Sequence, residues 1–516
     1  MSEVLLATLN ACYIHSAFGL RCLHANMAEL QPRCSILEFD IKQRAADIVE
    51  ELLAAQPKII GLGVYIWNVV PTTEVVGLLK QLAPDVRIVL GGPEVSFETN
   101  VQEIVRLADH VITGEADLAF AELCRGLLAG AIPPKVLAPA LPDLSKLASP
   151  YAFYQDEDIA HRVLYVEASR GCPFTCEFCL SSVDVPVRAF PLDAFLHKMD
   201  QLLARGARQF KFLDRTFNLN VQVSATILQF FLERWQPGMF FHFEMIPDRF
   251  PDALRDLIAR FPPGCLQFEV GIQSFNETVS NNISRRQNVA RLENNLRFLK
   301  DHSGVHVHAD LIAGLPGESL ASFADGFDRL WRLGPQEIQV GILKRLRGTP
   351  IIRHDREYAM VYAQLAPYEL LSSRDVDFAT LQRIKRFARH WDALGNSGRF
   401  SRTLPLLLEQ ARHASPFWNF WDFSQRLHAR HGKQQGISPA NLAEQLYLHL
   451  HEAGTDEATL AASLTADHLA SGGRGLPAYL PAATNAARHP PPAPQSASNR
   501  RQQRHLGGAT PEPGPP

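Results

Sequence analysis

The stretch EASRGCPFTCEFCLSS, residues 167–182, places three cysteines, Cys172, Cys176 and Cys179, within eight positions. The preceding run VLYVEAS (163–169) is typical of a β-strand, so the cysteines lie on the loop that leaves this strand. Three thiolates on one loop suit zinc or an iron–sulfur cluster, because both bind soft sulfur ligands. Structural zinc takes four protein ligands, and the sequence holds no second C-x-x-C. We therefore predict an iron–sulfur cluster whose open position takes a ligand from outside the chain.

A repeating strand-and-helix pattern surrounds this loop. The six β-rich runs are VLYVEAS (163–169), QFKFLD (209–214), FFHFEM (240–245), LQFEVGIQ (266–273), VHVHADLIAG (305–314) and EIQVGIL (337–343). Helical patterns separate them at spacings that suit successive βα units. We therefore predict a partial, TIM-like (β/α)6 barrel, whose chemistry lies at the carboxyl ends of the strands.

The residues before the barrel predict a second α/β domain. Its β-rich runs are VLLATLN (4–10), SILEF (35–39), KIIGLGVYI (58–66), VRIVLGG (86–92) and HVITGE (110–115), and amphipathic stretches occupy 43–55, 72–83 and 117–128. This alternation is typical of a doubly wound, Rossmann-like parallel sheet. Such sheets bind ligands beyond the carboxyl ends of their strands.

The whole chain divides into five predicted segments. They are a ligand-binding domain at 1–130, a linker at 131–160, the barrel at 161–350, a helical module at 351–475 and a tail at 476–516. The helical pattern of the module is clearest from 375 to 470, where we interpret PFWNFWDFS (416–424) as helix packing rather than as a cap over the barrel mouth. The tail lacks the apolar residues that offset ordering entropy, so we expect it to be disordered.

Composition narrows the function classes. The 516 residues are 46% hydrophobic and 20% charged, with a formal net charge of −3. This near-neutral balance gives no long-range attraction to nucleic acid or to anionic membranes. No run reaches the roughly 18 apolar residues of a membrane span, and Met-Ser-Glu leads directly into the first predicted strand, so we expect no signal peptide. Eight scattered or loop-bound cysteines indicate reduced thiols, and we expect a cytoplasmic protein.

The motif CPFTCEFC (172–179) resembles the C-x3-C-x-aromatic-C signature of the radical S-adenosylmethionine (SAM) superfamily. The resemblance implies a catalytic [4Fe–4S] cluster held by Cys172, Cys176 and Cys179, with Phe178 near the adenine. SAM would chelate the open iron through its amino and carboxylate groups. An electron from a donor such as flavodoxin or ferredoxin would then cleave SAM to a 5′-deoxyadenosyl radical.

Four further motifs extend this resemblance over residues 160–345. They are FLDRTFN (212–218), HFEM (242–245), VGIQSFN (270–276) and IAGLPGES (312–319). By the same resemblance, the expected SAM contacts are Asp214 to the amino group, Glu244 to the ribose, Gln273 and Ser274 at the fourth strand, Arg285 or its neighbour Arg286 to the carboxylate, and Gly314 at the adenine.

The first domain resembles the cobalamin-binding domain that precedes many radical SAM enzymes. The matching pieces are GLGVYIWN (61–68), LGGPEVS (90–96) and TGEAD (113–117). The cobalamin-site residues that the resemblance implies are Tyr65, Trp67, Asn68, Gly91, Gly92, Pro93, Glu94, Gly114 and Glu115. The glycine pair lets the backbone approach a ligand closely, or simply makes a tight turn. The D-x-H-x-x-G motif for an axial histidine is absent, as it commonly is in radical methylases; Tyr13 and His15 are further candidates to line the corrin.

These features predict a cobalamin-dependent radical SAM enzyme that methylates an unactivated carbon of an unknown small molecule or peptide. The alternatives are non-methylating radical chemistry, such as rearrangement or ring formation, and a non-catalytic cobalamin sensor. A transfer RNA methylthiotransferase is less favoured. That family carries three further cluster cysteines spread over its first domain and a basic β module after the barrel, whereas here Cys12, Cys22 and Cys34 lie on the first two units and helices follow the barrel.

Overall fold

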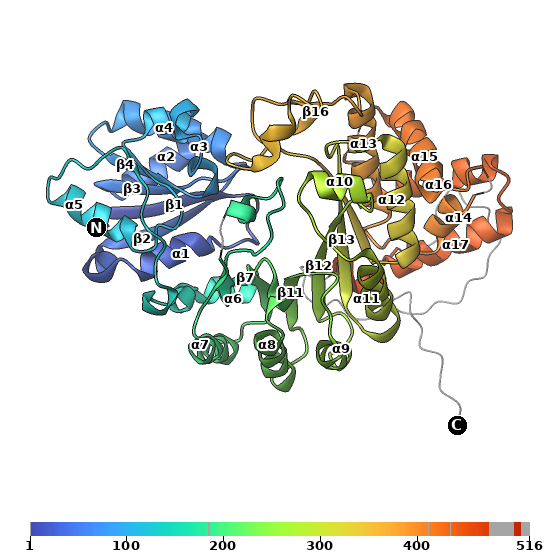
Figure 1. The fold of residues 1–516 in the computed structure, drawn as a ribbon, viewed down its shortest axis with the longest axis horizontal. Helices are drawn as coiled ribbons and strands as arrows, with labels where there is room; N and C mark the ends of the chain where they lie inside the picture. The colour runs from blue at the N-terminus through green and yellow to red at the C-terminus, as the bar shows by residue number, and fades with distance from the viewer. Residues whose placement is uncertain (1, 184–185, 411, 434, 474–499, 507–516) are drawn as a thin grey trace. The chain divides into compact units, whose positions relative to one another are not determined.

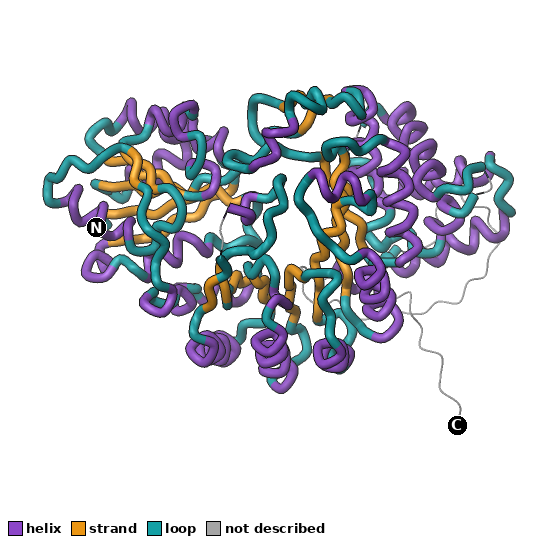
Figure 2. The backbone as a smooth tube through the Cα atoms, viewed as in Figure 1, coloured by secondary structure: helices purple, strands orange, loops and turns teal. Residues whose placement is uncertain are grey.

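The computed structural model describes residues 2–183, 186–410, 412–433, 435–473 and 500–506. Their fold consists of two compact units, which both contain helices and strands (Figure 2). The first unit comprises Met1–Arg215, Lys344–Arg353 and Tyr362–Glu369, and the second comprises Thr216–Leu343, His354–Val361 and Leu370–Pro516. Within the described ranges, no helix is long and apolar enough to cross a membrane.

The first unit is built on a parallel sheet of six strands in the order β2-β1-β3-β4-β5-β6. The strands are β1 (Val4–Asn10), β2 (Cys34–Asp40), β3 (Ile59–Gly63), β4 (Arg87–Gly91), β5 (His110–Ile112) and β6 (Val136–Leu137). The first five confirm predicted strands, whereas β6 lies in the segment predicted as a linker. Because β1 lies between β2 and β3, the strand order reverses there, and a crevice is expected at the carboxyl ends of β1 and β3.

Helices cover both faces of this sheet (Figure 1). One face carries α2 (Ala45–Ala54), α3 (Val69–Leu82) and α4 (Glu103–Leu107), and the other carries α1 (Phe18–Ala25) and α5 (Ala119–Leu128). Side chains alternate along β1: Leu5 and Ala7 pack with the first set of helices, whereas Val4 and Leu6 pack with the second. This two-sided burial confirms the doubly wound sheet.

The predicted barrel strands are all present. In the first unit β7 (Leu164–Val166) pairs in parallel with β10 (Gln209–Phe212). In the second unit β11 (Phe240–Met245), β12 (Leu266–Gln273), β13 (His306–Ala313) and β14 (Glu337–Ile342) pair in parallel and in chain order. The helices between successive strands are α7 (Leu192–Ala204), α8 (Val221–Glu233), α9 (Asp252–Ala259), α10 (Glu277–Asn282), α11 (Val289–His302) and α12 (Leu320–Leu333).

Strand β7 is shorter than the predicted run 163–169. The chain turns away after Val166, and β8 (Ser169–Arg170) instead pairs antiparallel with β9 (Arg188–Ala189). Strand β8 precedes the cysteine loop in sequence and β9 follows it. The loop therefore begins and ends at two strands that are paired with each other.

The helical module contains α13 (Phe378–Leu394), α14 (Thr403–Leu408), α15 (Pro416–His431), α16 (Pro439–Glu452) and α17 (Glu457–Ala470). Its core is aromatic. The ring centroid of Phe387 lies 4.7 Å from that of Phe417 and 4.9 Å from that of Phe420, and Trp391 lies 4.8 Å from Phe327 of the barrel helix α12. The aromatic residues of PFWNFWDFS thus pack between helices, as interpreted.

The predicted disorder of the tail is wrong for residues 500–506, which form helix α18 (Arg500–Leu506). Arg501 donates to the backbone oxygen of Asn396 at 2.8 Å, and Arg504 donates to that of Ser397 at 2.7 Å. Arg501 also lies 2.8 Å from the buried carboxylate of Glu337. These contacts to the turn after α13 and to the start of β14 hold the helix. The rest of the predicted tail lies outside the described residues.

A buried histidine makes the stability of the second unit depend on pH. His390 of α13 is 1% exposed, and its Nδ1 lies 2.8 Å from the hydroxyl of Ser424. Burial lowers the pKa of His390 to about 4. The unfolded chain therefore takes up a proton before the folded chain does, and stability falls as the pH drops from about 6.5 to 4, by up to about 3 kcal/mol.

We expect the variant His390→Gln to lose less stability on acidification than the parent protein. The free energy of unfolding in urea, followed by tryptophan fluorescence, should fall less steeply between about pH 7 and pH 5. Burial also lowers the pKa of His449 to about 4, so some pH dependence remains. Identical slopes for variant and parent would contradict the assignment.

Candidate functional site

The first unit contains a cavity of about 690 Å³ at the carboxyl ends of β1, β3 and β4. This volume lies within the range of small-molecule and cofactor sites. Seven of the nine predicted cobalamin-site residues line it: Tyr65, Trp67, Gly91, Gly92, Pro93, Gly114 and Glu115. His15 also lines it, whereas the hydroxyl of Tyr13 donates to Glu157 outside the wall. The crevice expected from the strand order is thus present.

The glycine pair, Gly91 and Gly92, forms the part of the wall at the end of β4. Gly92 has a φ of +108°, and a Cβ there would lie 2.5 Å from the backbone oxygen of Val64. A Cβ on Gly91 would instead meet its nearest neighbour, the oxygen of Ile112, at 3.9 Å. Only position 92 therefore requires a glycine for its backbone conformation, which supports the tight-turn interpretation for that residue. Both glycines still face the cavity.

Asn68 and Glu94 lie behind the cavity wall. Asn68 is fully buried; its amide donates to the oxygens of Leu9 and Gly63, each at 3.1 Å, and its Oδ1 accepts from the backbone nitrogen of Tyr65 at 2.8 Å. It therefore ties the ends of β1 and β3 together. Glu94 is also buried, and burial raises its pKa. These residues hold the lining loops in place.

An aromatic pair lies on the loop after β3. The rings of Tyr65 and Trp67 stack with centroids 4.4 Å apart and an interplanar angle of 6°. Trp67 is 50% exposed, although it follows a strand whose residues are all buried. An exposed, preformed aromatic surface of this kind suits contact with a flat, largely apolar ligand.

The cysteine loop follows β8. Cys172 and Cys176 are buried and Cys179 is partly buried, as is Phe178. The backbone nitrogen of Cys179 donates to the oxygen of Cys176 at 3.0 Å, which closes a turn across the C-x-x-C portion. Glu177, between two of the thiols, was not predicted as a site residue. Its carboxylate accepts two hydrogen bonds from Arg353, each at 2.6 Å.

The three thiols suit a cluster chemically. Burial raises the pKa of Cys172, and Cys179 and Cys176 raise it further, so the three groups lie within electrostatic reach of one another. Across the described part of the chain, no three histidine, cysteine or carboxylate side chains are drawn together closely enough to hold a metal ion. Cluster binding would therefore draw the thiols together and release their protons. The assignment of the three cysteines as ligands stays a prediction.

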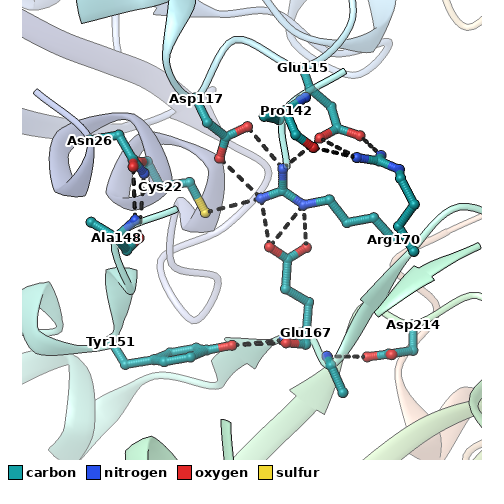
Figure 3. Close-up of polar contacts among 12 residues, drawn as sticks. Cys22, Asn26, Glu115, Asp117, Pro142, Ala148, Tyr151, Glu167, Arg170 and Asp214 are labelled. Atoms are coloured by element: carbon teal, nitrogen blue, oxygen red, sulfur yellow. Dashed lines mark hydrogen bonds and ion pairs between the residues drawn. The ribbon is translucent and has the colours of Figure 1, made fainter. Parts of the chain in front are cut away.

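A buried charge network lies directly before this loop (Figure 3). The guanidinium of Arg170 donates to Glu167 at 2.7 Å, to Asp117 at 2.9 and 3.1 Å, and to Glu115 at 2.8 Å. Arg188 also pairs with Glu115. Burial raises the pKa of Glu167 to about 7, although Arg170 opposes this shift. Three carboxylates thus surround two guanidinium groups at the edge of the cavity.

Four members of this network were missed by sequence reasoning: Asp117, Glu167, Arg170 and Arg188. The first three lie inside the quoted pieces TGEAD and EASRGC, so the signal available was an excess of charge beside each motif. Charged residues in such loops are usually solvated, and only the fold shows that these are buried.

Asp214 joins the ends of the first two barrel strands. Its carboxylate accepts from the backbone nitrogen of Ala168 at 2.9 Å and from the hydroxyl of Ser169 at 2.6 Å. Burial raises the pKa of Asp214 to about 6. Its two hydrogen bonds fix the backbone just before the cysteine loop.

The remaining predicted SAM contacts lie in the second unit. Three gather at the end of β12: Gln273, with a φ of +70°; Ser274, which donates to Glu318 at 2.5 Å; and Arg285, which donates to the backbone oxygen of Gly271. Burial raises the pKa of Glu318 to about 7.

Glu244 and Gly314 lie on the neighbouring strands of the same unit. Glu244 is in register with Glu269 across β11 and β12. Gly314 follows β13 with a φ of +86°, and a Cβ there would lie 2.6 Å from a methyl group of Leu370. All five of these residues therefore lie near the carboxyl ends of barrel strands, where the fold predicts chemistry.

The fold and the site define an α/β protein that joins a ligand-binding, doubly wound sheet to a partial barrel with a cysteine loop. Family models agree: a B12 binding domain matches residues 4–124, the radical SAM superfamily matches 166–330, and a protein family of unknown function, DUF4080, matches 356–494. The chain is a radical SAM protein with an N-terminal B12 binding domain. These two families imply the three predicted cofactors: cobalamin, a [4Fe–4S] cluster and SAM.

Curated relatives match only part of this chain, at low sequence identity. An uncharacterized methyltransferase of Pyrococcus horikoshii is 25% identical over 309 residues, which are 53% of this chain and 64% of the relative. The cobalamin-dependent radical SAM methyltransferase TokK of Streptomyces tokunonensis is 25% identical over 345 residues, 59% of this chain and 49% of the relative. The chain thus spans between about half and two thirds of these relatives. Ribosomal protein uS12 methylthiotransferases also match, at 20–25% identity.

A solved structure has the same fold. The radical SAM methyltransferase TsrM from Kitasatospora setae, with cobalamin and a [4Fe–4S] cluster bound, superimposes with a TM-score of 0.55 at 16% identity. The match covers 71% of this chain and 80% of that one. It confirms the predicted combination of a doubly wound sheet with a TIM-like barrel.

Proposed function

We propose that the chain is a cobalamin-dependent radical SAM methyltransferase that acts on a carbon atom of a small molecule or peptide. One observation carries the proposal: a single cavity is lined both by loops of the B12 binding domain, at Gly92 and Gly114, and by Glu167 and Arg170, which lead into the cysteine loop. The methyltransferase names of two curated relatives support the reaction type.

The residues present fit the three cofactors. The seven predicted residues of the cavity wall would hold cobalamin, the three cysteines would hold the cluster, and Phe178, Asp214, Glu244, Gln273, Ser274, Arg285 and Gly314 would hold SAM. When bound, these groups supply a transferable methyl group and a radical that abstracts hydrogen. The chain supplies orientation, and its buried walls exclude water from the reacting groups. We further propose that it works in the cytoplasm with a flavodoxin or ferredoxin as electron donor.

A methylthiotransferase is the second candidate, because uS12 methylthiotransferases are among the relatives. That function would need a second cluster on Cys12, Cys22 and Cys34. Cys22 lies 3.9 Å from the guanidinium of Arg170, whereas Cys34 lies close enough to Cys124 to raise the pKa of that thiol, although burial raises it more. These separate surroundings favour the methyltransferase.

The test is anaerobic reconstitution of the full chain with iron, sulfide and hydroxocobalamin, followed by incubation with SAM and titanium(III) citrate. We expect S-adenosylhomocysteine that requires cobalamin and 5′-deoxyadenosine that requires the cluster. Deoxyadenosine alone, with cobalamin bound, would overturn methyl transfer in favour of non-methylating chemistry. Cobalamin binding with neither product would overturn the methyltransferase in favour of a non-catalytic cobalamin sensor. A second cluster by iron analysis would favour the methylthiotransferase.

A further inference from the structure

Arg170 connects the cysteine loop to one loop of the cobalamin cavity. It lies two residues before Cys172, and its guanidinium bonds to Glu115 and Asp117 on the loop after β5 (Figure 3). The Arg170 side chain is 13% exposed and that of Asp117 is 7% exposed. Buried, multiply hydrogen-bonded ion pairs have strict geometry, and removing one partner leaves an uncompensated charge. This contact therefore fixes where the cysteine loop begins.

A segment from after the barrel, Lys344–Arg353, makes a second connection within the same unit. At one end Arg347 donates to Glu94 at 3.0 Å and to Glu98 at 2.9 Å, and Arg345 donates to Glu98 at 3.2 Å. Glu94 follows Pro93, so these bonds hold the cavity loop after β4. Tyr368 donates to Glu94 as well.

The other end of the segment holds the cysteine loop. The backbone nitrogen of Ile351 donates to the oxygen of Glu177 at 3.0 Å, and Arg353 pairs with the Glu177 carboxylate through two bonds of 2.6 Å. Glu177 is 6% exposed and lies immediately after Cys176. Midway, Gly348 packs so closely on Phe97 that a Cβ would overlap the ring, at 2.3 Å. The segment thus contacts the first domain from Arg345 to Gly348 and the cysteine loop from Ile351 to Arg353.

We propose that Arg170 and the segment Lys344–Arg353 are positioning elements that set the separation between the cobalamin loops and the cluster loop. The inference rests on the proposed function, in which both cofactors must act on one substrate carbon. The loop after β5 is joined by a buried ion pair to Arg170, two residues before Cys172. The loop after β4 is joined through Arg347 to the segment Lys344–Arg353, whose other end pairs with Glu177, beside Cys176. A misplacement of about 1 Å can cost a reaction about 100-fold, so such a separation must be held firmly.

The test measures the separation directly. Cob(II)alamin and the reduced cluster are both paramagnetic, so pulsed electron paramagnetic resonance reports the distribution of distances between them. We expect a narrow distribution in the parent protein and a broadened or shifted one in Arg353→Gln and Arg347→Gln, with cobalamin and iron still bound at parental stoichiometry. Arg353→Lys, which keeps the charge, should restore part of the narrow distribution.

Two further variants serve as a replacement and as a control. Glu177→Gln removes the same ion pair with little change of shape, so it replaces Arg353→Gln if that variant does not fold. Arg426→Gln breaks a bidentate pair with Glu452 in the helical module and is the matched control. A parental distribution in Arg347→Gln and in Arg353→Gln or Glu177→Gln, with both cofactors bound, would overturn the positioning role alone. Failure of the parent protein to bind cobalamin would overturn the proposed function, and the inference with it.

Discussion

Replacing Cys176 with alanine is expected to abolish cluster binding and SAM cleavage. A three-cysteine site has no spare protein ligand, since the fourth position belongs to SAM in the proposed function. After anaerobic reconstitution, iron and sulfide content should fall to background. The yield of 5′-deoxyadenosine should fall at least about 1,000-fold, which corresponds to about 4 kcal/mol of barrier height. Cobalamin binding should persist, because Cys176 lies outside the cavity wall.

The matched control is Cys12→Ala. Cys12 is partly exposed on the loop after β1, and the methylthiotransferase alternative needs it as a cluster ligand. The methyltransferase proposal expects parental iron content and parental deoxyadenosine in this variant. Loss of iron from Cys12→Ala would favour a second cluster. Retention of SAM cleavage by Cys176→Ala would reject the assignment of the cysteine loop.

The strands were predictable because their signal is local. Runs such as LQFEVGIQ and VHVHADLIAG are long and rich in β-branched and aromatic residues, and they form β12 and β13 within one residue of the predicted ends. The short strand β6 has two residues and no such pattern, and it forms because β5 offers it an open edge. Helix α18 likewise depends on acceptors more than 100 residues away in sequence, at Asn396 and Ser397.

The residues of the site were likewise predictable only where the local sequence or the strand order decides their place. Tyr65 follows β3 and the glycine pair lies at the end of β4, so their place follows from the strand order, and they line the cavity. The partner of Glu177 was not predictable, because Arg353 is 176 residues away and belongs to no motif, although Glu177 itself lies within CPFTCEFC. Asn68 and Glu94 were assigned to the ligand because they lie among lining residues. Hydrogen bonds that only the tertiary structure brings together turn them toward the backbone and toward Arg347 instead.

Substitution of Gly92 by alanine is expected to lower both stability and cobalamin affinity. Its φ of +108° lies where L-residues are strained, and the added Cβ would lie 2.5 Å from the backbone oxygen of Val64, which has no flexible end to move. Strain of this kind costs about 1–3 kcal/mol, and relief requires the loop after β4 to shift along the cavity wall. Urea unfolding and absorbance titration with hydroxocobalamin measure the two effects.

The variant Gly91→Ala distinguishes the effect of a side chain on the turn from its effect on ligand binding. Its Cβ would meet only ordinary contact, at 3.9 Å from the oxygen of Ile112, so stability should change by less than about 0.5 kcal/mol. If the ligand packs against this wall, Gly91→Ala lowers cobalamin affinity without lowering stability, whereas Gly92→Ala lowers both. Parental stability in Gly92→Ala would contradict the backbone argument. Both glycines line the cavity, so a methyl group on either would narrow it. Parental cobalamin affinity in both variants would therefore show that the ligand does not pack against the glycine pair.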